Sequence, residues 1–173
     1  MIIPPPLKKG DCIGLFSPSG PVRQPELFEA GLRLLHDLGF RTLHYPADSP
    51  SPEYLAADDQ ARAEEFHAMW ADPEVHAMMA VRGGYGCLRM MPCLDMNLLR
   101  QNAKLVIGFS DLTVLLNTLV ERVDTLAVHG PVLTSLPGSD SETVDSLTEV
   151  FAGRFAGARL FRGLEVLRGG TAE

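Results

Sequence analysis

The chain has 173 residues, of which 46% are hydrophobic and 21% are charged, which is enough for one domain with a hydrophobic core. Its formal net charge of −7, without a cluster of Lys and Arg, argues against a nucleic-acid partner, because binding phosphates requires a basic surface. No apolar run approaches the roughly 18–20 residues of a membrane span, and the N-terminus does not fit a secretory signal. Three cysteines without a CxxC pair indicate reduced thiols in a cytoplasmic protein.

Short apolar runs alternate with segments of helical period along the chain. Residues 12–16 predict a first strand, followed by the turn-rich loop Ser-Pro-Ser-Gly-Pro and a helix that begins near Pro25 and is capped by Gly39. Residues 41–44 predict a second strand, and residues 45–57 a polar loop. A helix capped by Asp58 or Asp59 then carries an apolar face.

A third strand is predicted at residues 77–81 and ends in Arg-Gly-Gly-Tyr-Gly at 82–86; a fourth follows at 104–109. The next helix places an apolar stripe on one face, and a fifth strand (126–128) and a last helix (139–151) complete the pattern. The stripe consists of Leu112, Leu115, Leu116, Leu119 and Val120. This alternation predicts an α/β domain of three layers with a mostly parallel sheet, whose ligands bind at the carboxyl ends of the strands.

Ser110 lies where the fourth strand gives way to a helix, a position with two interpretations. Serine is a favoured N-terminal helix cap, although Thr113 rather than Glu or Gln follows three residues later. Alternatively, a sharp turn presents the serine as a nucleophile at the edge of the sheet. Only half of the GxSxG pattern is present, since Gly108 precedes the serine by two residues but Leu112 follows it by two.

The glycine cluster at 82–86 predicts a loop with exposed backbone N–H groups. It fits a phosphate-binding motif poorly, and it can also be a tight turn without a ligand. If Ser110 is a nucleophile, the N–H groups of Asp111 and of Gly84 are candidates for the oxyanion hole. The Asp111 side chain is also favoured at a helix start for dipole reasons alone.

Three further groups have open roles. Arg82 is suited either to binding a substrate carboxylate or to holding its own loop by pairing with a local acid. His129 follows the fifth strand and approaches Ser110 if the fourth and fifth strands are neighbours, which leaves a role as base open. Glu64 and His67, an ExxH motif with His76 beyond it, predict a polar helix face rather than a metal site, so no metal is expected.

Four segments together carry a resemblance to a known family: SPSG at 17–20, RGGYG at 82–86, GFSDLT at 108–113 and HGP at 129–131. In this order and spacing they resemble the LD-carboxypeptidase family of serine peptidases, which is close to the microcin-immunity peptidases. The resemblance implies a flavodoxin-like or amidotransferase-like α/β domain, with Ser110 as nucleophile and Asp111 and Gly84 in the oxyanion hole. The expected substrate-binding residues are Arg82, Gly83, Tyr85 and His129.

The same resemblance implies an activity: removal of the terminal D-alanine from murein tetrapeptides during cell-wall recycling in the cytoplasm, without metal or cofactor, by proteins that are commonly homodimers. The family's catalytic Glu and His belong to a C-terminal domain. We therefore expect residues 1–157 to form the N-terminal nucleophile domain, 158–173 to begin a linker to a domain absent from this chain, and the chain alone to be nearly inactive.

Three alternatives remain open at this point. In the first, the domain is a non-catalytic module that binds a small anion or a peptide. In the second, its site is completed by a separately encoded half. The third alternative is a microcin-type hydrolase of acyl peptides.

Overall fold

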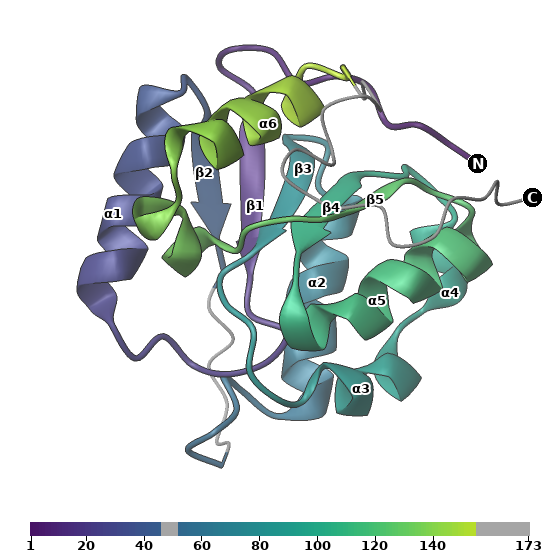
Figure 1. The fold of residues 1–173 in the computed structure, drawn as a ribbon. Helices are drawn as coiled ribbons and strands as arrows, with labels where there is room; N and C mark the ends of the chain where they lie inside the picture. Colours follow the sequence, from purple (N-terminus) through teal and green to yellow (C-terminus); the bar gives the residue numbers. More distant parts are fainter. Residues whose placement is uncertain (46–51, 155–173) are drawn as a thin grey trace, which may run out of the picture.

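The protein is described by a computed structural model that covers residues 1–45 and 52–154, so the predicted linker at 158–173 lies outside the described residues. The five strands form one parallel sheet in the order β2-β1-β3-β4-β5 (Figure 1). This is the strand order of flavodoxin-like folds, and it confirms the predicted α/β class. The strands are β1 (Cys12–Phe16), β2 (Arg41–His44), β3 (Val75–Ala80), β4 (Leu105–Gly108) and β5 (Ala127–His129).

Helices cover both faces of the sheet and make the three predicted layers (Figure 1). Because neighbouring residues of a strand point to opposite faces, Leu15 joins the core on one face and Phe16 the core on the other. One face carries α1 (Pro25–Asp37), the 3-10 segment η4 (Leu133–Gly138) and α6 (Ser141–Phe151). The other carries α2 (Asp59–Ala71), α3 (Cys87–Met90), α4 (Met96–Leu99) and α5 (Thr113–Thr118).

The capping signals in the sequence mark the ends of the long helices correctly. Pro25 is the first residue of α1, and Gly39 follows that helix with a φ of 96°. The side chain of Asp58 caps α2 by accepting a hydrogen bond from Ala61 N at 2.8 Å. The last helix starts two residues later than predicted because Asp140 caps it, accepting from Thr143 N at 2.7 Å.

The predicted apolar stripe after Ser110 is wrong at its last position. Val120 is 40% exposed, whereas the other four residues of the stripe are buried. From Leu119 the helix continues with π geometry as η3 (Leu119–Val123), whose wider turn breaks the α-helical spacing, and Val123 is buried. The short helices α3 and α4 were not predicted, because four residues are too few to show a period.

Candidate active site at the carboxyl edge of the sheet

The loops that follow β1, β3 and β4 meet at the carboxyl edge of the sheet, as the sequence predicted. A methyl group built on Gly83 would lie 3.1 Å from Ser110 Cβ and 3.3 Å from its Oγ. One built on Gly84 would lie 3.2 Å from the backbone nitrogen of Gly20. The order of the strands reverses between β1 and β3, which is where ligands bind in open parallel sheets.

Ser110 has a left-handed backbone conformation with a φ of 65°. Asn102 and Asp124 share this conformation among the described non-glycine residues, but Asn and Asp adopt it more readily than Ser does. The hydroxyl of Ser110 caps no helix and forms no hydrogen bond within the described part of the chain. The capping interpretation is therefore wrong, and the strained turn is that expected for a nucleophile elbow.

Gly108 explains why only half of the GxSxG pattern is present. A methyl group on Gly108 would lie 2.1 Å from Leu112 Cδ2 and 3.2 Å from Ala80 Cβ. The buried Leu112 thus occupies the space beside Gly108, so glycine is required at position 108 and a large side chain is accommodated at 112.

The carboxylate of Asp111 ties the three loops together, a role that the sequence did not predict. Its Oδ2 accepts hydrogen bonds from Ser19 Oγ at 2.7 Å and from Cys87 N at 2.8 Å. Ser19 belongs to the loop after β1, and Cys87 follows the glycine cluster. Burial raises the pKa of the Cys87 thiol to about 12, and Asp111 contributes in the same direction, so this thiol stays protonated and is a poor nucleophile.

Arg62, which is fully buried on α2, binds backbone groups of the same loops. Its guanidinium donates to the carbonyl oxygens of Ala57 at 3.1 Å, of Gly86 at 3.0 Å and of Pro18. It also pairs with Asp59. The side chain therefore joins the loop after β1 to the glycine cluster, and no motif in the sequence marked it.

Glu65 lies one helical turn further along α2 and supports the end of β1. Its Oε2 accepts a hydrogen bond from Ser17 N at 3.2 Å. Burial raises the pKa of Glu65 to about 8, and burial lowers the pKa of His44, whose Nε2 lies 3.9 Å from Glu65 Oε1. Both pKa shifts favour the uncharged forms, which weakens the contact between the two groups as an ion pair.

A hollow of about 600 Å³ opens beside Ser110. Arg82 is at its wall, but its Nε and Nη1 donate to the carbonyl oxygens of Gly83 at 3.1 Å and Pro21 at 3.0 Å, so it holds its loop through carbonyls and not through an acid. The hollow is lined by Arg23, Gln24, Leu27, Arg82, Gly83, Gly84, Phe109, Ser110, Val132, Thr134 and Ser135.

Two predicted substrate-binding residues lie outside this lining. Tyr85 is 61% exposed, and its ring lies 5.9 Å from that of Tyr54. His129 is on the strand next to β4, as expected, and faces Gly108 in the register. Its ring packs against Phe109 at 6.2 Å between centroids, and it forms no hydrogen bond with Ser110.

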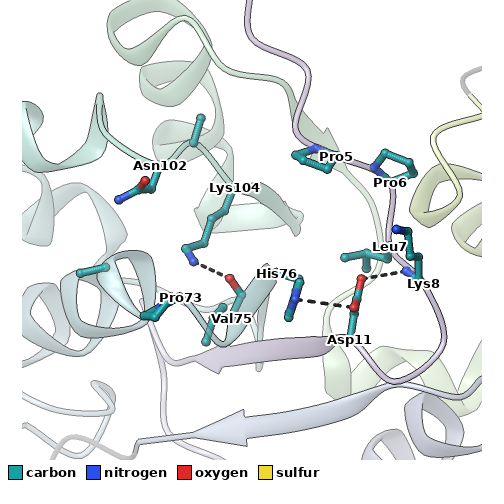
Figure 2. Close-up of a pocket in the computed structure, with 12 residues that line it drawn as sticks. Pro5, Pro6, Leu7, Lys8, Asp11, Pro73, Val75, His76, Asn102 and Lys104 are labelled. Atoms are coloured by element: carbon teal, nitrogen blue, oxygen red, sulfur yellow. Dashed lines mark hydrogen bonds and ion pairs between the residues drawn. The ribbon is translucent and has the colours of Figure 1, made fainter.

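A second hollow, of about 510 Å³, lies at the opposite edge of the sheet (Figure 2). Two of its polar side chains have structural partners: Lys104 Nζ donates to the carbonyl oxygens of Asp72 at 2.6 Å and of Val75, and His76 Nδ1 accepts from Cys12 N at 3.2 Å. Across the described residues no three His, Cys, Asp or Glu side chains converge as metal ligands. The ring of His67 instead accepts a hydrogen bond from Asp95 N at 2.9 Å.

The family described as the LD-carboxypeptidase N-terminal domain matches residues 13–130. The chain belongs to the LD-carboxypeptidase family. It is 32% identical over 137 residues to the probable murein peptide carboxypeptidase of Bacillus subtilis, covering 79% of this chain and 43% of the relative. It is 35% identical over 113 residues to the murein tetrapeptide carboxypeptidase of Pseudomonas aeruginosa, covering 65% of this chain and 36% of the relative.

Solved structures of this LD-carboxypeptidase family agree with the fold. The microcin C7 self-immunity protein MccF, in complex with aspartyl sulfamoyl adenosine, superposes with a TM-score of 0.83 at 28% identity, covering 91% of this chain and 49% of MccF. The chain thus spans less than half of the length of these relatives. None of the helices in the described ranges combines the length and the apolar character that crossing a membrane requires.

Proposed function

We propose that this chain is the nucleophile-bearing part of a serine LD-carboxypeptidase that removes the terminal D-alanine of murein tetrapeptides in the cytoplasm, during cell-wall recycling. Family membership and the names of the relatives support the reaction class. The observation that carries the proposal is Ser110 itself, which combines a φ of 65°, a hydroxyl without a partner in the described part of the chain and a position against the glycine cluster.

In the proposed reaction, Ser110 Oγ attacks the carbonyl carbon of the bond between the L-centre of the diamino acid and D-alanine. The N–H groups of Asp111 and Gly84 donate to the oxyanion of the tetrahedral intermediate. D-alanine leaves as its nitrogen takes a proton from the general acid, and water then hydrolyses the ester on Ser110 and releases the shortened peptide.

The general base and its orienting acid come from outside this chain in the proposed enzyme, as in the family's two-domain arrangement. A serine hydroxyl is a weak nucleophile without an adjacent base, and Ser110 contacts none by hydrogen bonding within the described residues. We therefore predict that the chain alone has little or no turnover. The homodimer that the family resemblance implies also stays a prediction.

Labelling with a fluorophosphonate, followed by mass spectrometry, tests the assignment of Ser110. We expect slow labelling of the wild-type chain at Ser110, none in Ser110→Ala, and unchanged labelling in Ser146→Ala, which removes an exposed hydroxyl from α6. Labelling that persists without Ser110 would contradict the proposal, and the absence of labelling in the wild type would favour a binding module.

Release of D-alanine from the tetrapeptide by the same proteins tests the divided site. We expect no release from the chain alone, and release when a C-terminal half of the family is supplied in trans. Release by the chain alone that depends on Ser110 would show that it holds its own base. His129, on the strand next to Ser110, would then be the first residue to substitute.

The likeness to MccF supports a second candidate substrate, an acyl conjugate of the kind bound in that structure. Protection of Ser110 from the fluorophosphonate distinguishes the two. A murein tetrapeptide should slow labelling if the first proposal holds, whereas aspartyl sulfamoyl adenosine should slow it if the site is of the microcin type.

A further inference from the structure

The hollow beside Ser110 is cationic in an acidic protein. Its ionisable side chains are Arg23 and Arg82, and its lining contains neither Asp nor Glu. The chain as a whole has 22 acidic and 15 basic residues, so the positive charge of this lining is opposite in sign to the net charge of the protein. Such a hollow favours a ligand that brings a negative group close to the serine.

The two arginines differ in what their guanidinium groups already bind. Arg82 donates through Nε and Nη1 to the carbonyl oxygens of Gly83 and Pro21. Arg23 is exposed and forms no hydrogen bond or ion pair with any described residue. Arg23 is therefore the cation of the hollow whose donors are all available to a ligand.

The position of Arg23 fits the group that the leaving residue of a carboxypeptidase carries. In D-alanine the carboxylate is separated from the scissile nitrogen by a single carbon atom, so it must lie close to the serine that attacks the bond. Arg23 lines the hollow from the loop before α1, and Ser110 lines it from the turn after β4. A guanidinium can bind a carboxylate through two parallel hydrogen bonds.

We infer that Arg23 binds the C-terminal carboxylate of the peptide substrate, so that the hollow receives the leaving residue and selects peptides with a free C-terminus. The inference rests on the proposed function and extends it by assigning a residue and a ligand group to substrate selection. The apolar side chains of Leu27, Phe109 and Val132 in the same lining suit the methyl group of alanine.

Binding of two peptides to the 173-residue chain tests this without requiring turnover. The ligands are the tetrapeptide L-Ala–γ-D-Glu–meso-diaminopimelate–D-Ala and the same peptide with a C-terminal amide, titrated while backbone amide shifts are followed by NMR. For the wild type we expect a Kd about fivefold lower for the acid than for the amide, which is typical of one exposed charge pair.

Arg23→Gln should raise the Kd of the acid by about fivefold, to that of the amide, and leave the Kd of the amide unchanged. Arg23→Lys should lie between the two, because it keeps the charge but not the fork of donors. Arg33→Gln is the matched control: it removes the same charge from an exposed position of α1 outside the hollow, and should change neither affinity.

Each outcome separates this inference from the proposed function. If the wild type binds acid and amide equally, or if Arg23→Gln weakens both alike, the role of Arg23 is wrong while the peptide substrate stands. If the wild type binds neither peptide, the inference and the proposed substrate are both wrong. Fluorophosphonate labelling of Ser110 then tests separately whether this residue is a nucleophile.

Discussion

The two edges of the sheet carry hollows of similar size, about 600 Å³ at the carboxyl edge and about 510 Å³ at the amino edge, but they differ in how their polar groups are used. At the amino edge Lys104 donates to the carbonyl oxygen of Val75, and His76 Nε2 lies 3.6 Å from the Asp11 carboxylate (Figure 2). At the carboxyl edge the hydroxyl of Ser110 has no hydrogen-bond partner among the described residues, and its backbone is strained.

The difference shows that a hollow with polar walls is not by itself a site. The carbonyl oxygens of Asp72 and Val75 accept from Lys104, so this side chain holds the end of α2 beside the start of β3. The left-handed conformation of Ser110 destabilises the fold, and no hydrogen bond of its hydroxyl within the described residues offsets this cost. Such strain is typical of residues in functional sites. The comparison predicts that substitutions at the two edges have separable effects on stability and on reactivity.

The largest expected effect concerns Glu65, beneath the carboxyl edge. Its pKa of about 8 in the folded state lies above the ordinary value of 4.5, so the folded state binds the proton more tightly than the unfolded state does. The stabilisation that protonated Glu65 contributes is therefore fully present below pH 4.5 and is lost as the pH rises towards 8. Relative to Glu65→Gln, the free energy of unfolding of the wild type should fall by roughly 3 kcal/mol between pH 5 and pH 8.

Urea unfolding at several pH values measures this difference. His44, at 3.9 Å, and Arg62 are present in both proteins, so their own titration largely cancels in the comparison. Parallel pH profiles for the wild type and Glu65→Gln would show that the acid is not held in its neutral form.

At the amino edge, Lys104→Met should cost about 2 kcal/mol of stability. The substitution keeps most of the stem but removes the Lys104 donor from the buried carbonyl oxygen of Val75 and from the carbonyl oxygen of Asp72, which still accepts from Val75 N. The rate of fluorophosphonate labelling at Ser110 should not change. Lys8→Met, an exposed lysine in the same lining, should alter stability by less than about 0.5 kcal/mol. A loss of labelling in folded Lys104→Met would break the separation between the two edges.

At the carboxyl edge, Gly83→Ala should slow labelling of Ser110 about tenfold, because the new methyl group lies 3.1 Å from Ser110 Cβ and displaces it. The loss of stability should stay below about 1 kcal/mol, since the backbone of Gly83 is not left-handed. Gly138→Ala, with no atom within 4 Å of the added methyl group, is the control. An unchanged labelling rate would mean that Ser110 does not depend on this contact.

The smallest expected effect is a gain. Ser110→Gly should raise the free energy of unfolding by about 0.5 kcal/mol, because glycine tolerates a φ of 65° while adding some entropy to the unfolded chain. Asn102→Gly, at a φ of 56° on the amino edge, should gain less, since asparagine already adopts this conformation. Thermal unfolding of the two variants compares them, and an equal or smaller gain at Ser110 would contradict the strain assigned to it.

Much of the architecture followed from local patterns. The strands, the cap at Asp58, the glycine after α1 and the three loops at the carboxyl edge were predicted correctly, because periodicity and capping depend on residues within one or two turns. The resemblance to the LD-carboxypeptidase family added the assignment of Ser110, Asp111 and Gly84, whose roles stay predictions. The boundary at residue 157 also stays a prediction.

The sequence by itself determined which segments reach the carboxyl edge, and tertiary structure decided what their side chains do there. The bond between Ser19 and Asp111 joins residues 92 positions apart, and Arg62 reaches Pro18 across 44. Arg82 donates to carbonyl oxygens of its own and a neighbouring loop, whereas Arg23 lines the hollow without binding a described residue. No local pattern reveals such partners, because the hydrogen bonds of a buried or converging side chain are set by elements that only the folded sheet brings together.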